Sequence, residues 1–180
     1  MKIYIIERNE EKFNHIVPYF DDLKDVMLIN GDFKTCMDNY DIECIVSPAN
    51  SYGIMTGGYD KAIIDYFGND IQNKVQNYII ENYYGEQPVA TSFIIDIDSD
   101  KKLIHTPTMR VPKKIKDERV VYQCMRTTLM LAKQNNIKSI LIPLFGGSTG
   151  GINPRNIAIM MRQAYNQIEE LSQQHIKRLK

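Results

Sequence analysis

Short runs of apolar residues recur along the chain, each about as long as a β-strand. Several of them are apolar at nearly every position, which is typical of strands covered on both faces of a sheet. We therefore predict that these runs form the strands of a buried sheet. They occupy residues 2–7, 26–30, 42–48, 91–97, 102–106 and 139–145.

Between these strands, apolar residues recur every three or four positions, which is the period of an amphipathic helix. The pattern predicts helices over residues 10–20, 60–83 and 154–175, and one more around the apolar stripe that begins at Val121. Strands that alternate with helices indicate the α/β class. We predict one domain over residues 1–180: a three-layer α/β/α sandwich with a mixed, mostly parallel sheet of about six strands.

The composition is that of a folded domain without excess charge. Of the 180 residues, 43% are apolar, and Lys plus Arg equal Asp plus Glu at 22 each, so the formal net charge is zero. A broad surface for nucleic acid or for an acidic membrane is therefore not indicated, although a local basic patch stays open. No apolar run approaches the length of a membrane span, and the start of the chain does not look like a signal peptide. We expect a cytoplasmic protein.

The three cysteines, Cys36, Cys44 and Cys124, lack the spacing of a metal site. We interpret them as reduced thiols in a reducing compartment rather than as nucleophiles. The sequence thus predicts neither a metal nor a cofactor.

Two glycine-bearing loops follow predicted strands and lead into predicted helices, at residues 47–60 and 146–154. In an α/β sheet, ligands bind beyond the carboxyl ends of the strands, where both loops would lie. Glycines before a helix N-terminus let backbone N–H groups approach an anion such as a phosphate. One such loop alone is better explained by a tight turn. Two of them indicate a ligand with two adjacent phosphates.

Neither loop fits the common nucleotide motifs. The Gly-Lys-Ser/Thr of a P-loop is missing, and Gly57-Gly58 lies too far beyond its strand for the dinucleotide fingerprint. Kinase or NTPase chemistry is therefore disfavoured.

The order of these motifs resembles that of the macro domain family, the ADP-ribose-binding module. The sequences of the motifs resemble a bacterial and phage-type subgroup of that family. The family pattern runs Gly-Asp-Ile, an Asp, a strand that ends in Asn-Ala-Ala-Asn, and Gly-Gly-Val-Asp-Gly-Ala-Ile. A strand with a His and a second phosphate loop follow later. The matching segments here are GDF (31–33), Asp41, CIVSPAN (44–50), GGYDKAI (57–63), LIHTPTM (103–109) and PLFGGSTGGINP (143–154).

The resemblance implies a role for each matching residue. Asp32, with Phe33 beside it, would accept a hydrogen bond from the adenine amino group, and Asn50 would bind the distal ribose, with Ser47 in the place of the family's first Asn. Two sets of loop residues would wrap the pyrophosphate. These are Gly57 and Gly58 in the first loop and Gly146, Gly147, Ser148, Thr149, Gly150, Gly151 and Ile152 in the second.

Asp60 matches the acid that helps to activate a water in the hydrolytic members, and with Asn50 it is the catalytic candidate. The substrate would be ADP-ribose on a protein or nucleic acid, ADP-ribose-1″-phosphate or O-acetyl-ADP-ribose. Simpler interpretations stay open, because Asp32 could cap a turn and Asp60 could cap a helix.

Departures from the family pattern keep two other functions open. Ser47 replaces an Asn and Ile64 replaces a frequent His, which favours a binding module without turnover. Ser148 replaces a Gly, and its hydroxyl could add a phosphate hydrogen bond or narrow the loop. A third hypothesis is binding of RNA or poly(A), but the zero net charge disfavours a strong form of it.

The chain stops after its last helix, whereas most macro domains end with a further strand and helix. Residues 2–20 have the composition and order of that missing piece, so we hypothesise a circular permutation. Glu7, Arg8 and Asn9 would then lie at the adenine end of the cleft, where Arg8 could stack on the base. The alternative is an extra edge strand.

Two further features are ambiguous. His105 is expected to be an interior side chain with a partner rather than a catalyst. The polar segment 110–119 is either a solvated face or a loop that bends over the cleft and attracts phosphates through Lys113 or Lys114.

Overall fold

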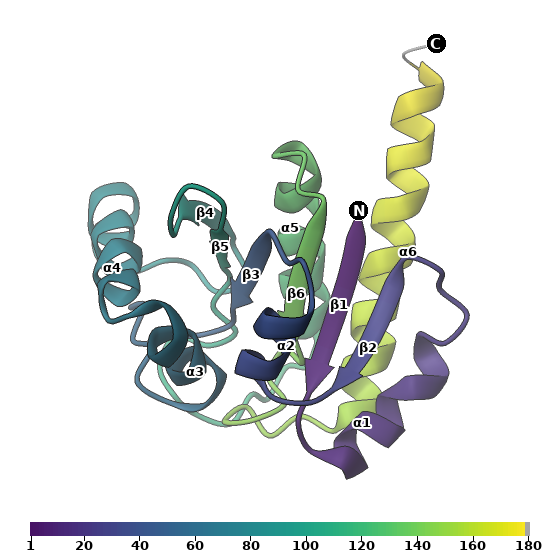
Figure 1. The fold of residues 1–180 in the computed structure, drawn as a ribbon, viewed down its shortest axis with the longest axis horizontal. Coiled ribbons are helices and arrows are strands. Elements are labelled where there is room, and N and C mark those ends of the chain that lie inside the picture. Colours follow the sequence, from purple (N-terminus) through teal and green to yellow (C-terminus); the bar gives the residue numbers. More distant parts are fainter. Residues whose placement is uncertain (179–180) are drawn as a thin grey trace.

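A computed structural model describes residues 1–178, and the side chains of residues 1–174. Six strands form one sheet in the order β2-β1-β6-β3-β5-β4, and every neighbouring pair is parallel except β4 and β5 (Figure 1). The strands are β1 (Lys2–Glu7), β2 (Val26–Asn30), β3 (Cys44–Ser47), β4 (Phe93–Asp96), β5 (Lys102–His105) and β6 (Ser139–Pro143).

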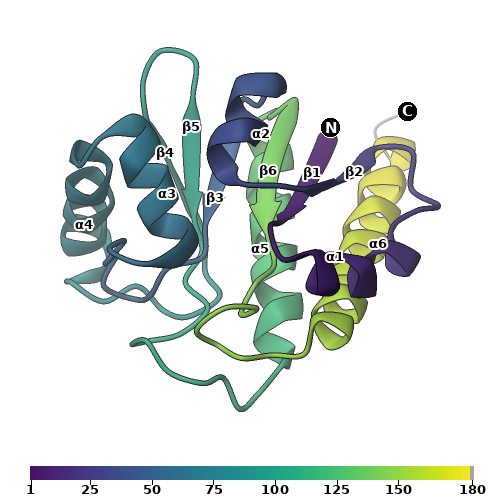
Figure 2. The same cartoon turned by 60° about the horizontal axis from the view of Figure 1, so that its bottom comes forward.

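Helices cover both faces of the sheet (Figures 1 and 2). The predicted three-layer α/β/α fold is therefore confirmed. One face carries α1 (Glu10–Ile16), α5 (Arg119–Gln134) and α6 (Pro154–Arg178), with the short 3₁₀ turn η1 (Val17–Tyr19) after α1. The other face carries α2 (Phe33–Asn39), α3 (Gly58–Phe67) and α4 (Asp70–Tyr83).

The alternation of side chains along the inner strands explains the two cores. In β1, Ile3 and Ile5 point to the core under α5 and α6, whereas Tyr4 and Ile6 point to the core under α2 and α3. All four are buried, which accounts for an apolar run without polar interruptions.

The predicted helix 60–83 is wrong in one respect, because two helices replace it. Gly68 ends α3 with a φ of 98°, a conformation that side chains other than glycine rarely adopt, and the chain restarts as α4 at Asp70. The apolar period of four runs through the break, and Ile63 and Ile71 both face the same core. The apolar pattern therefore gives no sign of the break between the two helices. The apolar pattern did not predict the short helix α2.

Strand β1 lies inside the sheet, bonded to β2 on one side and β6 on the other (Figure 1). The alternative of an extra edge strand is therefore wrong. An interior place beside the pocket residues Arg8 and Asn9 is what the permutation hypothesis requires, and the permutation itself stays a prediction.

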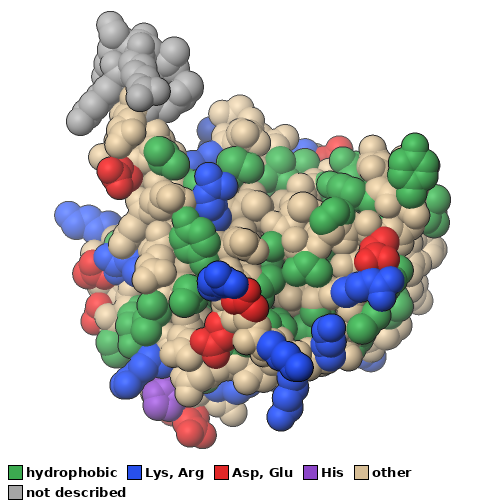
Figure 3. All heavy atoms as spheres, turned by 180° about the vertical axis from the view of Figure 1, so that it is seen from behind, with side chains coloured by type: hydrophobic (Ala, Val, Ile, Leu, Met, Phe, Trp, Pro, Cys, Tyr) green, Lys and Arg blue, Asp and Glu red, His purple; other side chains and the backbone are tan. Residues whose placement is uncertain are grey.

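Charged side chains of both signs are interspersed on the face of the molecule seen in Figure 3, in keeping with the zero net charge. Among the residues that the structure describes, no helix combines the length and the apolar character needed to cross a bilayer.

Candidate functional site

A pocket of about 550 Å³ opens at the carboxyl ends of β1, β3 and β6, at the lower end of the sheet in Figure 1. In Figure 2 this end is turned toward the viewer, and the loops after β1 and β6 lie on the same side of the sheet. Thirteen of the predicted site residues line it: Arg8, Asn9, Asp32, Phe33, Asn50, Gly57, Gly58, Asp60, Gly146, Gly147, Ser148, Thr149 and Gly150.

The loop after β6 is held from behind by its own backbone and by the segment before α5. Gly151 donates to the carbonyl of Ser148 at 3.0 Å, and Ile115 donates to the carbonyl of Gly150 at 2.9 Å. The N–H groups of Ser148, Thr149 and Gly150 donate no hydrogen bond within residues 1–178. The loop thus presents unpaired donors beside the pocket, as a phosphate cradle does.

Gly150 shows why this loop needs a glycine. A β-carbon there would lie 2.6 Å from the carbonyl oxygen of Gly146 and 2.6 Å from Cδ1 of Ile115. The polar segment 110–119 therefore packs on the loop through Ile115, and Pro112 lines the pocket. Neither Lys113 nor Lys114 belongs to the pocket wall, so the expectation for those two lysines has no support in the structure.

The facing wall is the loop that ends in Gly57 and Gly58. Gly57 caps α3 in an extended conformation and offers no side chain to the N–H groups of the first turn. A β-carbon on Gly58 would lie 4.0 Å from Oγ of Ser148, so the two glycine loops approach each other closely.

Asp60 lies in the first turn of α3 and is buried, with 9% of its surface exposed. Ser47, at the end of β3, donates from its Oγ to Oδ1 of Asp60 at 2.6 Å. Burial raises the pKa of Asp60 to about 7, against the opposing effect of the Ser47 hydrogen bond. The pocket therefore has a carboxyl group that titrates near neutral pH.

Asn50 lines the pocket, but its side chain forms hydrogen bonds within its own loop. Its Oδ1 accepts from the N–H of Tyr52 at 3.1 Å, and its Nδ2 donates to the carbonyl of Ile54 at 2.9 Å. Only 4% of Asn50 is exposed. The residue therefore shapes the loop, and one of its two amide N–H donors is already paired.

Asp32 and Phe33 start α2 at another side of the pocket. Asp32 accepts from the N–H of Thr35 at 2.9 Å and from its Oγ1 at 2.8 Å, so it caps the helix. These two hydrogen bonds hold the pKa of Asp32 below its ordinary value, so the carboxylate is ionised at neutral pH. The carboxylate still has lone pairs for a further donor.

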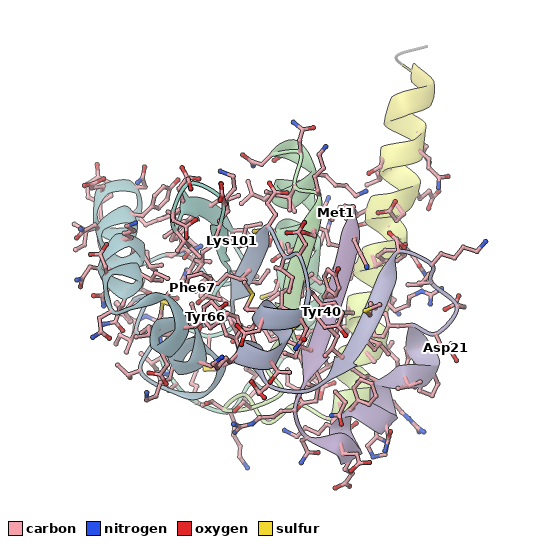
Figure 4. All side chains as sticks on the ribbon, in the orientation of Figure 1. Met1, Asp21, Tyr40, Tyr66, Phe67 and Lys101 are labelled. Carbon is pink, nitrogen blue, oxygen red and sulfur yellow. The ribbon has the colours of Figure 1, made fainter. Side chains whose placement is uncertain are left out.

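Phe33 is buried in an aromatic cluster rather than free to stack on a ligand. Its ring meets Tyr59 edge-on at 5.4 Å between centroids, and Tyr66 and Phe67, labelled in Figure 4, complete the cluster. Phe33 thus belongs to the pocket wall with only 3% of its surface exposed.

Three predicted residues do not line the pocket. Ser47 is fully buried and donates to Asp60, Ile152 packs against Gly146, and Gly151 is exposed. Several other lining residues were not among the predicted site residues: Lys12, Ile54, Thr56, Tyr59, Ala62, Thr108, Met109 and Pro112.

His105 is buried at the end of β5, away from the pocket wall. Its Nδ1 lies 2.5 Å from Oε1 of Gln87, while Nε2 has no partner within the described residues. Burial lowers the pKa of His105 to about 3, so the ring is neutral. The expectation of an interior histidine is confirmed.

Solved structures of low sequence identity share the fold. The macrodomain of Mycobacterium tuberculosis DarG superposes with a TM-score of 0.62 at 19% identity, over 72% of this chain and 85% of that one. The Oceanobacillus iheyensis macrodomain with ADP gives 0.62 at 24% identity, over 70% and 68%. Thermosipho africanus DarTG in complex with ADP-ribose gives 0.61 at 13% identity, over 89% and 49%.

Sequence comparison agrees. An uncharacterized protein of Aquifex aeolicus is 29% identical over 136 residues, which are 74% of this chain and 76% of that protein. The family profile described as Macro domain matches residues 46–161. That match covers both glycine loops, Asp60 and three of the six strands in full. The chain belongs to the macro domain family.

Proposed function

We propose that this protein binds ADP-ribose or a derivative of it in the pocket between the two glycine loops. The observation that carries the proposal is the pair of facing loops with unpaired N–H groups, Ser148 to Gly150 on one side and Gly57 to Gly58 on the other. They suit a diphosphate. Asp32 offers an acceptor for the adenine amine, and two structural relatives are named with ADP and with ADP-ribose.

We further propose that the protein hydrolyses ADP-ribose from a modified group. Asp60 in its ionised form would take a proton from a water, whose oxygen forms a bond to the anomeric carbon of the distal ribose. The bond from that carbon to the modified group breaks, and the released group takes up a proton. The substrate would be an ADP-ribosylated protein or nucleic acid, or a small ADP-ribose ester. A pKa of about 7 gives Asp60 a substantial ionised fraction at neutral pH.

A binding module without turnover is the second candidate, and two observations favour it. One N–H of the Asn50 amide is paired within its own loop, and Ile64 stands where the family pattern often has a His. Such a module would sequester ADP-ribose or a related nucleotide signal.

Calorimetric titration with ADP-ribose, AMP and NAD tests the binding. Tight binding of ADP-ribose with weak binding of AMP supports reading of the second phosphate and distal ribose; no binding of ADP-ribose contradicts the proposal. Incubation with ADP-ribosylated peptide and with ADP-ribose-1″-phosphate then separates the enzyme from the module. In the enzyme, Asp60→Ala abolishes release of ADP-ribose and spares its affinity.

A cytoplasmic location is part of the same proposal. It is supported by the three cysteines, all of which are free thiols in the structure.

A further inference from the structure

Both cations of the pocket wall, Arg8 and Lys12, come from the N-terminal segment. Lys12 lies in α1, and its Nζ donates to the carbonyl oxygen of Gly147 at 2.7 Å. The bond joins residues 135 positions apart in the sequence, so it ties the N-terminal helix to the glycine loop after β6. Both residues line the same pocket.

The other charged residues of the pocket wall are committed elsewhere or lie away from this loop. Glu7 accepts from the N–H of Asn9 at 2.8 Å, Asp32 caps α2, and Asp60 is paired with Ser47. Arg8 is exposed at the end of β1 and makes no hydrogen bond to the loop within residues 1–178. Lys12 is therefore the charged side chain of the wall that contacts the predicted phosphate loop.

The ammonium group of Lys12 has donors to spare. A lysine carries three N–H donors, and one of them reaches Gly147. The side chain is half-buried, so its charge is less screened than that of a fully exposed lysine. A diphosphate held by the N–H groups of Ser148 to Gly150 would lie beside this charge.

We propose that Lys12 is a ligand-binding residue that supplies a positive charge to the diphosphate of the bound nucleotide. The inference rests on the proposed function and extends it, because it makes the N-terminal segment part of the phosphate site rather than a structural addition. The backbone N–H groups give the diphosphate its hydrogen bonds, and Lys12 offsets part of its doubly negative charge.

Three variants of Lys12 separate charge from positioning. Lys12→Gln removes the charge but keeps a donor for Gly147, Lys12→Met removes both, and Lys12→Arg keeps the charge. Lys24→Gln is the control, because Lys24 is exposed outside the pocket wall and the net charge changes by the same amount. The affinities of the full chain for ADP-ribose and for uncharged adenosine are measured by calorimetry at low and at high salt.

We expect Lys12→Gln and Lys12→Met to bind ADP-ribose about fivefold more weakly at low salt, the size of a partly exposed ion pair. The difference from the wild type should shrink at high salt, adenosine should bind unchanged, and Lys12→Arg and Lys24→Gln should resemble the wild type.

Three results would overturn the inference. Lys12→Gln could bind ADP-ribose as tightly as the wild type at low salt. The loss of affinity could extend equally to adenosine, or it could be confined to Lys12→Met. Any of these would leave Lys12 a structural residue while ADP-ribose binding by the wild type stands. A wild type that binds no ADP-ribose would instead remove the proposed function and this inference together.

Discussion

Ser47 and Asp60 form a buried hydrogen-bonded pair, with Oγ of Ser47 2.6 Å from Oδ1 of Asp60. Ser47 ends β3 and Asp60 lies in the first turn of α3, so the pair joins the sheet to the helix beside the pocket. Burial raises the pKa of Asp60 to about 7, and the hydroxyl donor of Ser47 limits that rise. Stability and turnover should both depend on this carboxyl group.

Asp60→Asn should stabilise the protein at neutral pH. The protonated form of Asp60 is favoured in the folded state, so its contribution is fully present below its ordinary pKa of 3.8 and is lost as the pH rises to about 7. The amide does not titrate. The variant should match the wild type near pH 4 and gain on the order of 4 kcal/mol above pH 7.

Thermal or urea unfolding of both proteins across this pH range measures the difference. A gap that stays constant with pH would show that Asp60 has an ordinary pKa. The same series run with Asp65→Asn provides the control, since Asp65 is exposed and pairs with Lys61 on the surface of α3.

Ser47→Ala should move the pH dependence of turnover upward. If ionised Asp60 is the base, turnover by the wild type rises with pH and levels off above about pH 7. Loss of the Ser47 donor favours the protonated carboxyl, so the midpoint should rise by about one pH unit. The measurement is kcat/KM against pH, with ADP-ribose affinity as the check that the pocket is intact. An unmoved midpoint would mean that Ser47 does not tune Asp60 during the reaction.

The sheet could be predicted from the sequence because a strand that is buried on both faces is apolar at nearly every position. Residues 3–6 and 140–145 are apolar throughout, and the structure buries them on both faces of the sheet. The break at Gly68 could not be predicted from the apolar period, because α3 and α4 keep the same phase toward the core on both sides of it. The register and the interior place of β1 depend on contacts across the sheet, which no local pattern contains.

The parts of the site that depend on glycine loops and a helix start could be predicted. The parts that depend on long side chains from other segments could not. The glycine loops can be recognised from their composition, and the first turn of α3 places Asp60 beside them. Lys12 looks like an ordinary helix lysine until α1 packs beside the loop after β6, and Ile115 looks like part of a polar segment until it covers Gly150. Such contacts arise only from tertiary packing.

Gly150→Ala should damage the phosphate loop. The new methyl group would meet the carbonyl of Gly146 at 2.6 Å, and backbone cannot give way as a flexible side chain does. We expect a loss of about 1–3 kcal/mol in the free energy of unfolding and at least a roughly tenfold weaker affinity for ADP-ribose. Chemical unfolding and calorimetry measure the two effects.

Gly57→Ala is the matched control in the facing loop. Its φ of −141° suits any residue, and a β-carbon there meets no atom within 4 Å, so stability should stay within about 0.5 kcal/mol of the wild type. Equal stabilities of Gly57→Ala and Gly150→Ala would show that the loop after β6 adapts to the added methyl group.

Substitutions of Asp32 should separate helix capping from adenine recognition. Asp32→Ala loses the hydrogen bonds from Thr35 and should cost about 1 kcal/mol of stability, whereas Asp32→Asn keeps a capping oxygen and should unfold like the wild type. The amide in Asp32→Asn presents a donor where the carboxylate offered an acceptor, so it should repel the adenine amine. The wild type should therefore prefer adenosine over inosine, which lacks that amine, and Asp32→Asn should lose the preference. If Asp32→Asn discriminates as well as the wild type does in calorimetry, Asp32 is a cap and nothing more.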